Sequence, residues 1–344
     1  NYPSKNFNVV TYTGDGSTSN AISNLGFSPD MVWIGQRSSP TADYSNGIWD
    51  TTRGRAKVFY SHRTNAEPSD SSSTQDLVSF DSDGFTVGTN NNASVNASSK
   101  EMVGWCWKAN GGTTSSDSSG DITVTRQSNT KGGFAILTYS GNGSSDQTIA
   151  HGLGKKPDWI MVKCETHAHE WTVYHVGSSD PSDKVLYLNA TNAETDWPYF
   201  GDTDPTSSVF TVSSDLQTGR VNYDYIAYCW TAIEGFSKFG AYVGNASTNG
   251  PFVNLGFRPS WLMVKRLDST NNWQIFDSNR NKFNPVDLRL YADVTTVEAQ
   301  GTSSDIFDFT ANGFKVREDN AAINASSGRY LYCAFAEFPF VGSG

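Results

Sequence analysis

A unit of roughly 100 residues occurs three times along this chain, and this repetition limits the possible folds more than any other feature of the sequence. Each copy contains a Gly-containing turn, a proline and a hydrophobic strand, at residues 25–34, 153–162 and 255–264. Proline cannot donate a hydrogen bond to a β ladder, so it is expected at the edge or the start of a strand. A shared Tyr-x-Gly turn precedes each segment, at residues 12–16, 139–143 and 242–245. The sequence therefore predicts three units of similar fold.

The pattern within each unit is that of short β-strands. Segments such as 134–139 and 85–87 are rich in β-branched or aromatic residues, and Gly, Asn or Asp bounds them. Asp-Gly and Asn-Gly turns at 83–84 and 312–313 are strong hairpin signals. Charged residues make up only 17% of the chain and aromatic residues 13%, a composition unsuited to exposed helices. We predict an all-β protein of three tandem antiparallel β-sandwich domains, jelly-roll-like in topology.

Motif spacing sets the expected domain bounds. The three sandwiches are predicted at residues 1–110, 132–235 and 236–344, with a Gly/Ser-rich linker at 111–131. Short helices are conceivable near 65–67 and 192–196. The connecting segment at 234–239 is short and aromatic, so we expect the second and third domains to pack directly. The first domain is expected to hang on the linker.

The cysteines suggest free thiols. Cys106, Cys229 and Cys333 each follow an aromatic residue near the end of a repeat, and we interpret them as one equivalent core position. Equivalent positions in separate domains cannot bridge one another, and Cys164 has no evident partner. Four free thiols indicate assembly in a reducing cytoplasm.

The charge of the chain excludes two kinds of partner. The formal net charge is −10, which argues against nucleic acid and against an anionic membrane surface, since both need clustered Lys and Arg. No apolar run approaches the roughly 18 residues of a membrane-spanning helix. We therefore expect neither nucleic-acid binding nor membrane insertion.

The best candidate for a metal site is His167 and His169, because residues two apart on a strand share one face. His175 follows on the next predicted strand, and His-x-His from three chains around a threefold axis would supply six nitrogen ligands. The other two copies lack these histidines, so solvated loop histidines are the competing interpretation. Asp81 and Asp83 resemble part of a calcium loop, although a hairpin turn explains them equally well.

The sequence offers no distinctive catalytic constellation. It has no Gly-x-Ser-x-Gly elbow and no Gly-rich phosphate loop, and His151 lies in a turn where a structural role is expected. Carboxylates that meet only in space would escape this reading, so glycoside hydrolysis stays open as an alternative. We predict no enzymatic activity, no catalytic residues and no cofactor.

Exposed aromatic side chains are the candidates for surface binding, since their flat faces suit sugar rings. Trp49, Trp171 and Trp273 lie at roughly equivalent repeat positions, which favours core packing. Trp197 and Tyr199 belong instead to an irregular segment of the middle copy. They are the predicted contact residues for a glycan or another partner.

The motifs resemble a family of tailed-phage virion proteins, especially of marine phages, with tandem tail-fibre-like β-repeats. The matching segments are 50–54 and 79–85 in the first copy, 151–154 in the second, and 250–253 and 284–287 in the third. The resemblance covers nearly the whole chain and implies a place in the virion more firmly than a task. It supplies no catalytic residues. Position 35 is Gly where the family often has Lys, and the second copy lacks the Asp-Gly hairpin.

These observations lead to one main hypothesis and two alternatives. We expect a non-enzymatic structural virion protein, assembled in the host cytoplasm, that forms a tail fibre, another appendage or a surface decoration. Its expected partners are itself, as a homotrimer, other virion proteins, and host surface glycans. The alternatives are a carbohydrate-binding lectin and a polysaccharide depolymerase.

Overall fold

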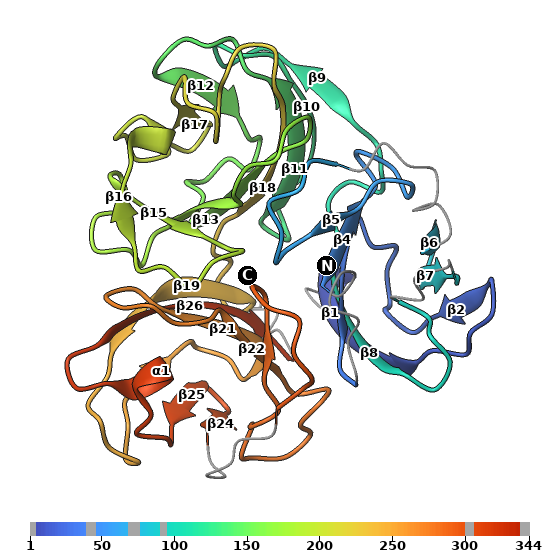
Figure 1. Ribbon diagram of the computed structural model, residues 1–344, viewed down its shortest axis with the longest axis vertical. Helices are drawn as coiled ribbons and strands as arrows, with labels where there is room; N and C mark the ends of the chain where they lie inside the picture. Colours follow the sequence, from blue (N-terminus) through green and yellow to red (C-terminus); the bar gives the residue numbers. More distant parts are fainter. Residues whose placement is uncertain (1–4, 39–45, 68–75, 90–94, 300–305, 338–344) are drawn as a thin grey trace.

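The computed structural model describes residues 5–38, 46–67, 76–89, 95–299 and 306–337. Three β-lobes surround a common centre, and each lobe corresponds to one sequence repeat (Figure 1). The strands of the first repeat are β1 (Phe7–Thr13), β2 (Asn20–Ile22), β3 (Met31–Gln36), β4 (Gly47–Asp50), β5 (Phe59–Tyr60), β6 (Leu77–Asp81), β7 (Gly84–Val87) and β8 (Glu101–Trp107).

The second repeat contains β11 (Phe134–Ser140), β12 (Gln147–Ala150), β13 (Trp159–Cys164), β14 (Thr172–His175), β15 (Lys184–Tyr187), β16 (Thr195–Asp196), the 3-10 helix η3 (Pro198–Phe200), β17 (Val209–Val212) and β18 (Asp224–Trp230). The third contains β19 (Ser237–Val243), β20 (Phe252–Asn254), β21 (Pro259–Arg266), β22 (Gln274–Asp277), β23 (Leu290–Tyr291), β24 (Phe307–Thr310), β25 (Gly313–Val316), the short helix α1 (Ala321–Asn324) and β26 (Arg329–Ala336).

One strand order recurs in all three repeats. The large sheets run β1-β8-β3-β4-β5, β11-β18-β13-β14-β15 and β19-β26-β21-β22-β23, and every pairing within them is antiparallel. A small sheet faces each large one: β2-β7-β6, β12-β17 and β20-β25-β24. The predicted antiparallel all-β class is confirmed. The hairpins predicted at Asp83-Gly84 and Asn312-Gly313 also form, between β6 and β7 and between β24 and β25.

The segment predicted as a linker is structured, which corrects the sequence-based expectation. It carries β9 (Ser115–Asp117) and β10 (Val124–Asn129), and β10 pairs along β11 to extend the large sheet of the second repeat. Val124 is buried, and Gly111 and Gly112 donate backbone hydrogen bonds to Asp30 of the first repeat. A Gly/Ser-rich composition resembles a linker, but it does not prevent pairing when a neighbouring sheet edge is available. Neither 65–67 nor 192–196 is helical, and the second of these segments includes β16.

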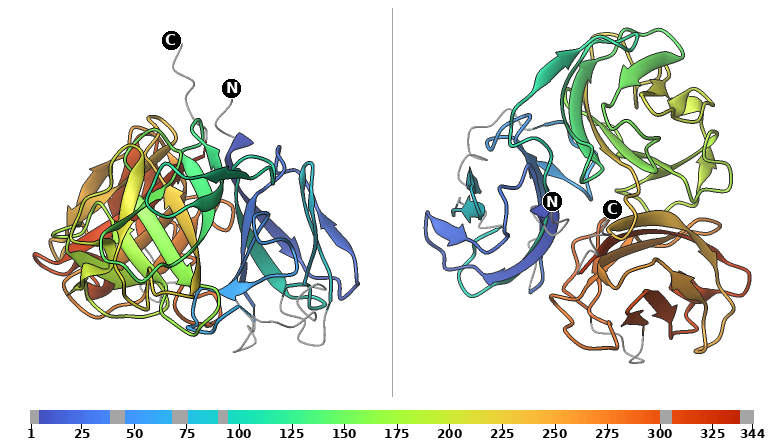
Figure 2. Two further views of the ribbon diagram at one scale, coloured as in Figure 1. Left: turned by 90° about the horizontal axis from the view of Figure 1, so that it is seen from above. Right: turned by 180° about the vertical axis from the view of Figure 1, so that it is seen from behind.

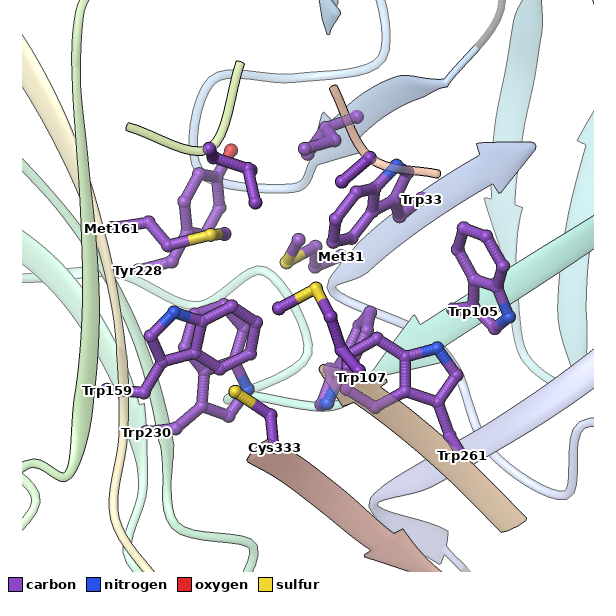
Figure 3. Close-up of a cluster of buried hydrophobic side chains, with 14 of the residues drawn as sticks. Met31, Trp33, Trp105, Trp107, Trp159, Met161, Tyr228, Trp230, Trp261 and Cys333 are labelled. Carbon is purple, nitrogen blue, oxygen red and sulfur yellow. The ribbon is translucent and has the colours of Figure 1, made fainter. Parts of the chain in front are cut away.

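Each repeat has an apolar interior between its large and small sheets, and a further core lies where the three large sheets meet. The three lobes lie around this centre (Figure 2). The central core combines side chains from every repeat, so the three units do not pack as separate bodies (Figure 3). All residues of β3 and β13 are buried because one face of each strand meets the small sheet and the other meets the central core. The labelled members of this core in Figure 3 are Met31, Trp33, Trp105, Trp107, Trp159, Met161, Tyr228, Trp230, Trp261 and Cys333.

The central core corrects the expectation that the first repeat hangs apart. The Trp107 ring of the first repeat lies 5.9 Å from Trp230 of the second and 5.8 Å from Trp261 of the third, measured between centroids. Phe7 stacks on Phe335 at 4.7 Å, which joins the first described strand to the last. All three repeats therefore share one buried aromatic interior.

Two hydrogen-bond patterns repeat around the centre and show a threefold arrangement within one chain. The first pattern links a backbone N–H of one repeat to a carbonyl of the next: Glu67 to Glu165 (2.8 Å), Glu194 to Leu267 (2.9 Å) and Glu298 to Arg37 (2.8 Å). The second links a side chain before the fourth strand to the tyrosine carbonyl that ends the fifth strand of its neighbour: Trp171 to Tyr60 (3.1 Å), Trp273 to Tyr187 (2.9 Å) and Asn46 to Tyr291 (2.9 Å).

These equivalent contacts close on themselves. The first repeat meets the second, the second meets the third and the third meets the first, each through the same surfaces. Head-to-tail interfaces form a closed ring when the rotation between units allows it, and here the ring is complete in a single polypeptide. We call each contact region between two repeats a junction.

The cysteines are free and buried, as predicted, but only two of the three repeat-end cysteines are equivalent. Cys106 and Cys229 face the interiors of their own sandwiches, whereas Cys333 faces the central core. In strand register, Cys333 matches Trp105 and Tyr228. A shift of one residue moves a side chain to the other face of a sheet. The similar sequences around these cysteines therefore do not place all three at the same register position.

Candidate functional site

A buried polar cluster lies at the junction of the first and second repeats. Strand β4 ends at Asp50, and the following turn brings Arg53 back so that its Nε lies 2.6 Å from Asp50 Oδ2. The backbone N–H groups of Thr52 and Arg53 donate to Asp50 Oδ1 at 3.0 and 2.9 Å. Tyr228 of the second repeat donates its hydroxyl to Asp50 Oδ2 at 2.7 Å. A buried ion pair of one repeat thus binds the neighbouring repeat directly.

The charge states of Arg53 and Tyr228 suit a structural contact between the two repeats. Burial opposes a charged Arg53, but the neighbouring acidic groups, Asp50 first among them, together outweigh it and raise the pKa of Arg53 above its ordinary value. Burial, and then the negative charge of Asp50, raise the pKa of the Tyr228 hydroxyl well above its usual range. Arg53 therefore stays a cation and Tyr228 stays a neutral donor at physiological pH, and neither is adapted to transfer a proton.

The same positions meet at the other two junctions with different chemistry. Where the third repeat meets the first, Asp277 pairs with Arg280 at 2.5 Å and accepts a hydrogen bond from Trp105 Nε1 at 3.2 Å. Where the second meets the third, His175 Nε2 lies 3.4 Å from Cys333 Sγ. Burial lowers the pKa of His175 to about 3 and raises that of the Cys333 thiol, so this pair is neutral. Both ring nitrogens of His175 have neighbours inside the fold, since Nδ1 accepts from the Gly177 N–H at 2.9 Å, and among the described residues His175 does not converge with His167 and His169.

Sequence reasoning did not assign these junction residues to contacts between repeats. One signal was available: Asp-x-x-Arg follows the fourth strand in the first and third copies, at Asp50–Arg53 and Asp277–Arg280. An acid and a base three residues apart after a buried strand suggest a buried pair. Neither segment indicates which residue of the neighbouring repeat, Tyr228 or Trp105, the aspartate binds.

A polar hollow of about 380 Å³ opens beside the first of these junctions. Arg53 and Lys57 of the first repeat and Glu165 and Asp224 of the second contribute to its wall. Burial raises the pKa of Glu165 to about 7, Arg53 lowers it, and the nearby carboxylates of Glu67 and Asp50 raise it further. This side chain therefore titrates near neutral pH.

We expect this carboxyl group to make the protein less stable as the pH rises. The folded pKa of Glu165 lies above the value of 4.5 for an unperturbed glutamate, so its contribution is fully present below pH 4.5 and is lost as the pH rises through 7. Between pH 5 and pH 8 the free energy of unfolding of the parent should fall by roughly 1–3 kcal/mol more than that of Glu165→Gln. Urea unfolding at the two pH values measures this difference. The exposed Asp224→Asn is the matched control. An identical pH slope for the parent and Glu165→Gln would contradict the expectation.

The predicted metal ligands lie in a bend after β13. The ring centroids of His167 and His169 are 6.5 Å apart, and His167 stacks on Tyr223 at 3.7 Å. Among the residues that the structure describes, no three His, Cys, Asp or Glu side chains converge in a way that could hold a metal ion. A metal shared between chains stays a prediction.

The remaining titratable candidates have partners in the fold. Asp83 accepts hydrogen bonds from the backbone N–H groups of Asn24 and Gly26, and Asp81 accepts from Thr86. This pattern fits the hairpin turn. His151 is buried and its Nδ1 accepts from the Leu153 N–H at 3.2 Å, in keeping with the structural role expected for it.

The tryptophans divide clearly into buried and exposed. Trp49, Trp171 and Trp273 are fully buried, which confirms the core interpretation. Trp171 and Trp273 are equivalent, whereas Trp49 faces the interior of its own sandwich and is not. Trp197 is 48% exposed and lies parallel to Tyr199, at 5.8 Å between centroids, while Tyr199 itself is buried. Of the two predicted contact residues, Trp197 therefore lies at the surface, whereas Tyr199 is too buried to contact a glycan or partner itself.

Fold and contacts define a class: a single-chain all-β protein whose three repeats close around one aromatic core. Among the described residues, no helix is long and apolar enough to cross a membrane. The chain belongs to a family described as a domain of unknown function (DUF7483), whose model matches residues 2–339 as one unit. No curated protein and no solved structure matches the chain.

Proposed function

We propose that this chain is a non-enzymatic structural protein of a tailed-phage virion, a tail fibre, another appendage or a surface decoration. The observation that carries the structural role is the central core, in which all three repeats bury their large aromatic side chains together. The virion location is supported by the sequence motifs of the three repeats, which resemble those of tail-fibre-like virion proteins.

A continuous core suits a part that must keep its shape outside the cell. Separate domains on linkers can move relative to one another, whereas domains that share a large apolar interface move as one. The junction contacts involving Asp50, His175 and Asp277 fix how the repeats sit. Four buried free thiols are in keeping with assembly in the reducing cytoplasm of a host.

The expected homotrimer stays a prediction, but a threefold arrangement no longer requires three chains. The chain already forms a threefold arrangement, in which each repeat contacts the other two through equivalent surfaces. A homotrimer would need a different surface. Light scattering of the purified chain at several concentrations measures its mass directly, and a mass of one chain at all of them would remove the homotrimer from the proposal.

The proposed location is tested on particles of a tailed phage whose genome encodes this sequence. Gradient-purified particles should contain the chain at a fixed copy number by quantitative mass spectrometry, and cryo-electron microscopy should place its three-lobed density on the tail or the capsid. A lysate of cells expressing the chain without the phage, run on the same gradient, is the control. A chain found in infected lysates but absent from purified particles would overturn the virion role.

A further inference from the structure

Trp197 is the exception among the ten tryptophans of this chain. The other nine are fully buried, whereas almost half of the Trp197 surface is exposed. A large apolar side chain placed in solvent gains nothing from folding, so its position calls for another explanation. Single exposed apolar residues are common on protein surfaces, and exposure alone does not indicate a site.

Two features show that the Trp197 ring is held in place. Its backbone N–H donates to the Asp183 carbonyl at 3.2 Å, and its carbonyl accepts from the Tyr199 N–H at 2.8 Å. The indole lies at 6° to the Tyr199 ring. The indole therefore packs parallel to a buried ring, at 5.8 Å between centroids, while about half of its surface meets solvent. A fixed aromatic face loses little conformational freedom when it binds a ligand.

The short helix η3 that follows is anchored on both sides. Thr218 Oγ1 donates to the Tyr199 carbonyl at 2.8 Å, and Phe200 packs into the interior of the second repeat. Gly201 ends the helix with φ of 66°, a left-handed conformation that favours glycine. The platform formed by Trp197 and Tyr199 is thus built on rigid structure.

A surface hollow of about 690 Å³ begins at the same segment, with Pro198 and Gly201 in its wall. Its polar lining combines three serines with three exposed carboxylates and one exposed guanidinium, from Asp146, Asp202, Asp215 and Arg220. Ser213, which also lines the hollow, donates its backbone N–H to the Tyr199 carbonyl at 3.1 Å, so the hollow adjoins the platform. An apolar flat face and hydrogen-bonding groups therefore lie next to each other.

We propose that this platform and hollow bind a neutral or amino-sugar glycan. The apolar C–H face of a pyranose ring would stack on Trp197, and its hydroxyl groups would donate to the carboxylates of Asp146, Asp202 and Asp215. Three carboxylates against one arginine, on a chain of net charge −10, repel uronic and sialic acids. The binding site goes beyond the proposed structural role, and either proposal can fail without the other.

The test uses the full chain and oligosaccharides of glucose, of glucosamine with its N-acetylated form, and of galacturonic acid. Calorimetry should show saturable binding of a neutral or amino-sugar oligosaccharide and none of the uronic acid. Trp197→Ala should weaken that binding by about tenfold or more. Because the other nine indoles are buried, iodide quenching of fluorescence should report Trp197 and fall when the glycan binds.

Phe252→Ala is the matched control, because Phe252 is 46% exposed on the third repeat and lies outside the hollow. This variant should bind like the parent, and thermal melts of both variants should match it. Equal affinity of Trp197→Ala and the parent would overturn the proposal. So would binding of the uronic acid alone, or no binding of any of these oligosaccharides.

Discussion

Replacing Arg53 with methionine should lower the free energy of unfolding by about 3–5 kcal/mol. The side chains of Arg53 and Asp50 are 1% and 0% exposed, so the change leaves a carboxylate without its cation in the interior. Arg53 also bonds to Glu67 and to the hydroxyl of Tyr228, and these contacts are lost together. Urea unfolding followed by near-ultraviolet circular dichroism measures the loss.

A surface pair supplies the control for this measurement. Lys184 and Asp196 form an ion pair at 3.3 Å with side-chain exposures of 29% and 69%, and such pairs contribute about 0–1 kcal/mol. Lys184→Met should therefore leave the unfolding midpoint nearly unchanged. If Arg53→Met cost no more than Lys184→Met, the ion pair at the first junction would not hold the repeats together.

Replacing Trp107 with alanine should destabilise all three repeats at once, by about 3–5 kcal/mol. The ring lies at the centre of the shared core, and its aromatic neighbours come from every repeat: Phe7, Phe134, Trp230, Trp261 and Phe335. The cavity would open onto all three large sheets. Hydrogen exchange should accelerate in β8, β18 and β26 together.

The exposed Val243→Ala serves as the reference for Trp107→Ala, because a surface substitution is expected to stay within about 0.5 kcal/mol. Faster exchange confined to the first repeat would show that the repeats unfold independently. That result would also remove the observation on which the proposed structural role depends.

The repeated fold could be predicted from the sequence because its signals are local. A proline before a hydrophobic strand and Asp-Gly or Asn-Gly at hairpins act within a few residues, and they marked strands such as β13 and β21 correctly. The exposed position of Trp197 was also predictable, because it lies in an irregular segment between two short elements.

The packing of the repeats could not be predicted in the same way. A strand buried on both faces loses the alternation that tells an inner side chain from an outer one, and β13 is such a strand. Nothing in the sequence around Trp105 and Trp107 indicates that both side chains face the centre of the molecule. Partners such as Asp50 and Tyr228 are 178 residues apart, and no local pattern connects them.

The contact between Phe7 and Phe335 has a consequence for how the polypeptide is threaded. The first described strand begins where the last one ends, and Trp107 and Trp230, from which the chain crosses to the next repeat, lie at the same end of the molecule. Because the backbone contacts between repeats are equivalent at all three junctions, we expect the packing not to depend on which repeat comes first. A circularly permuted chain that starts at the second or third repeat should fold into the same arrangement of three repeats around the central core.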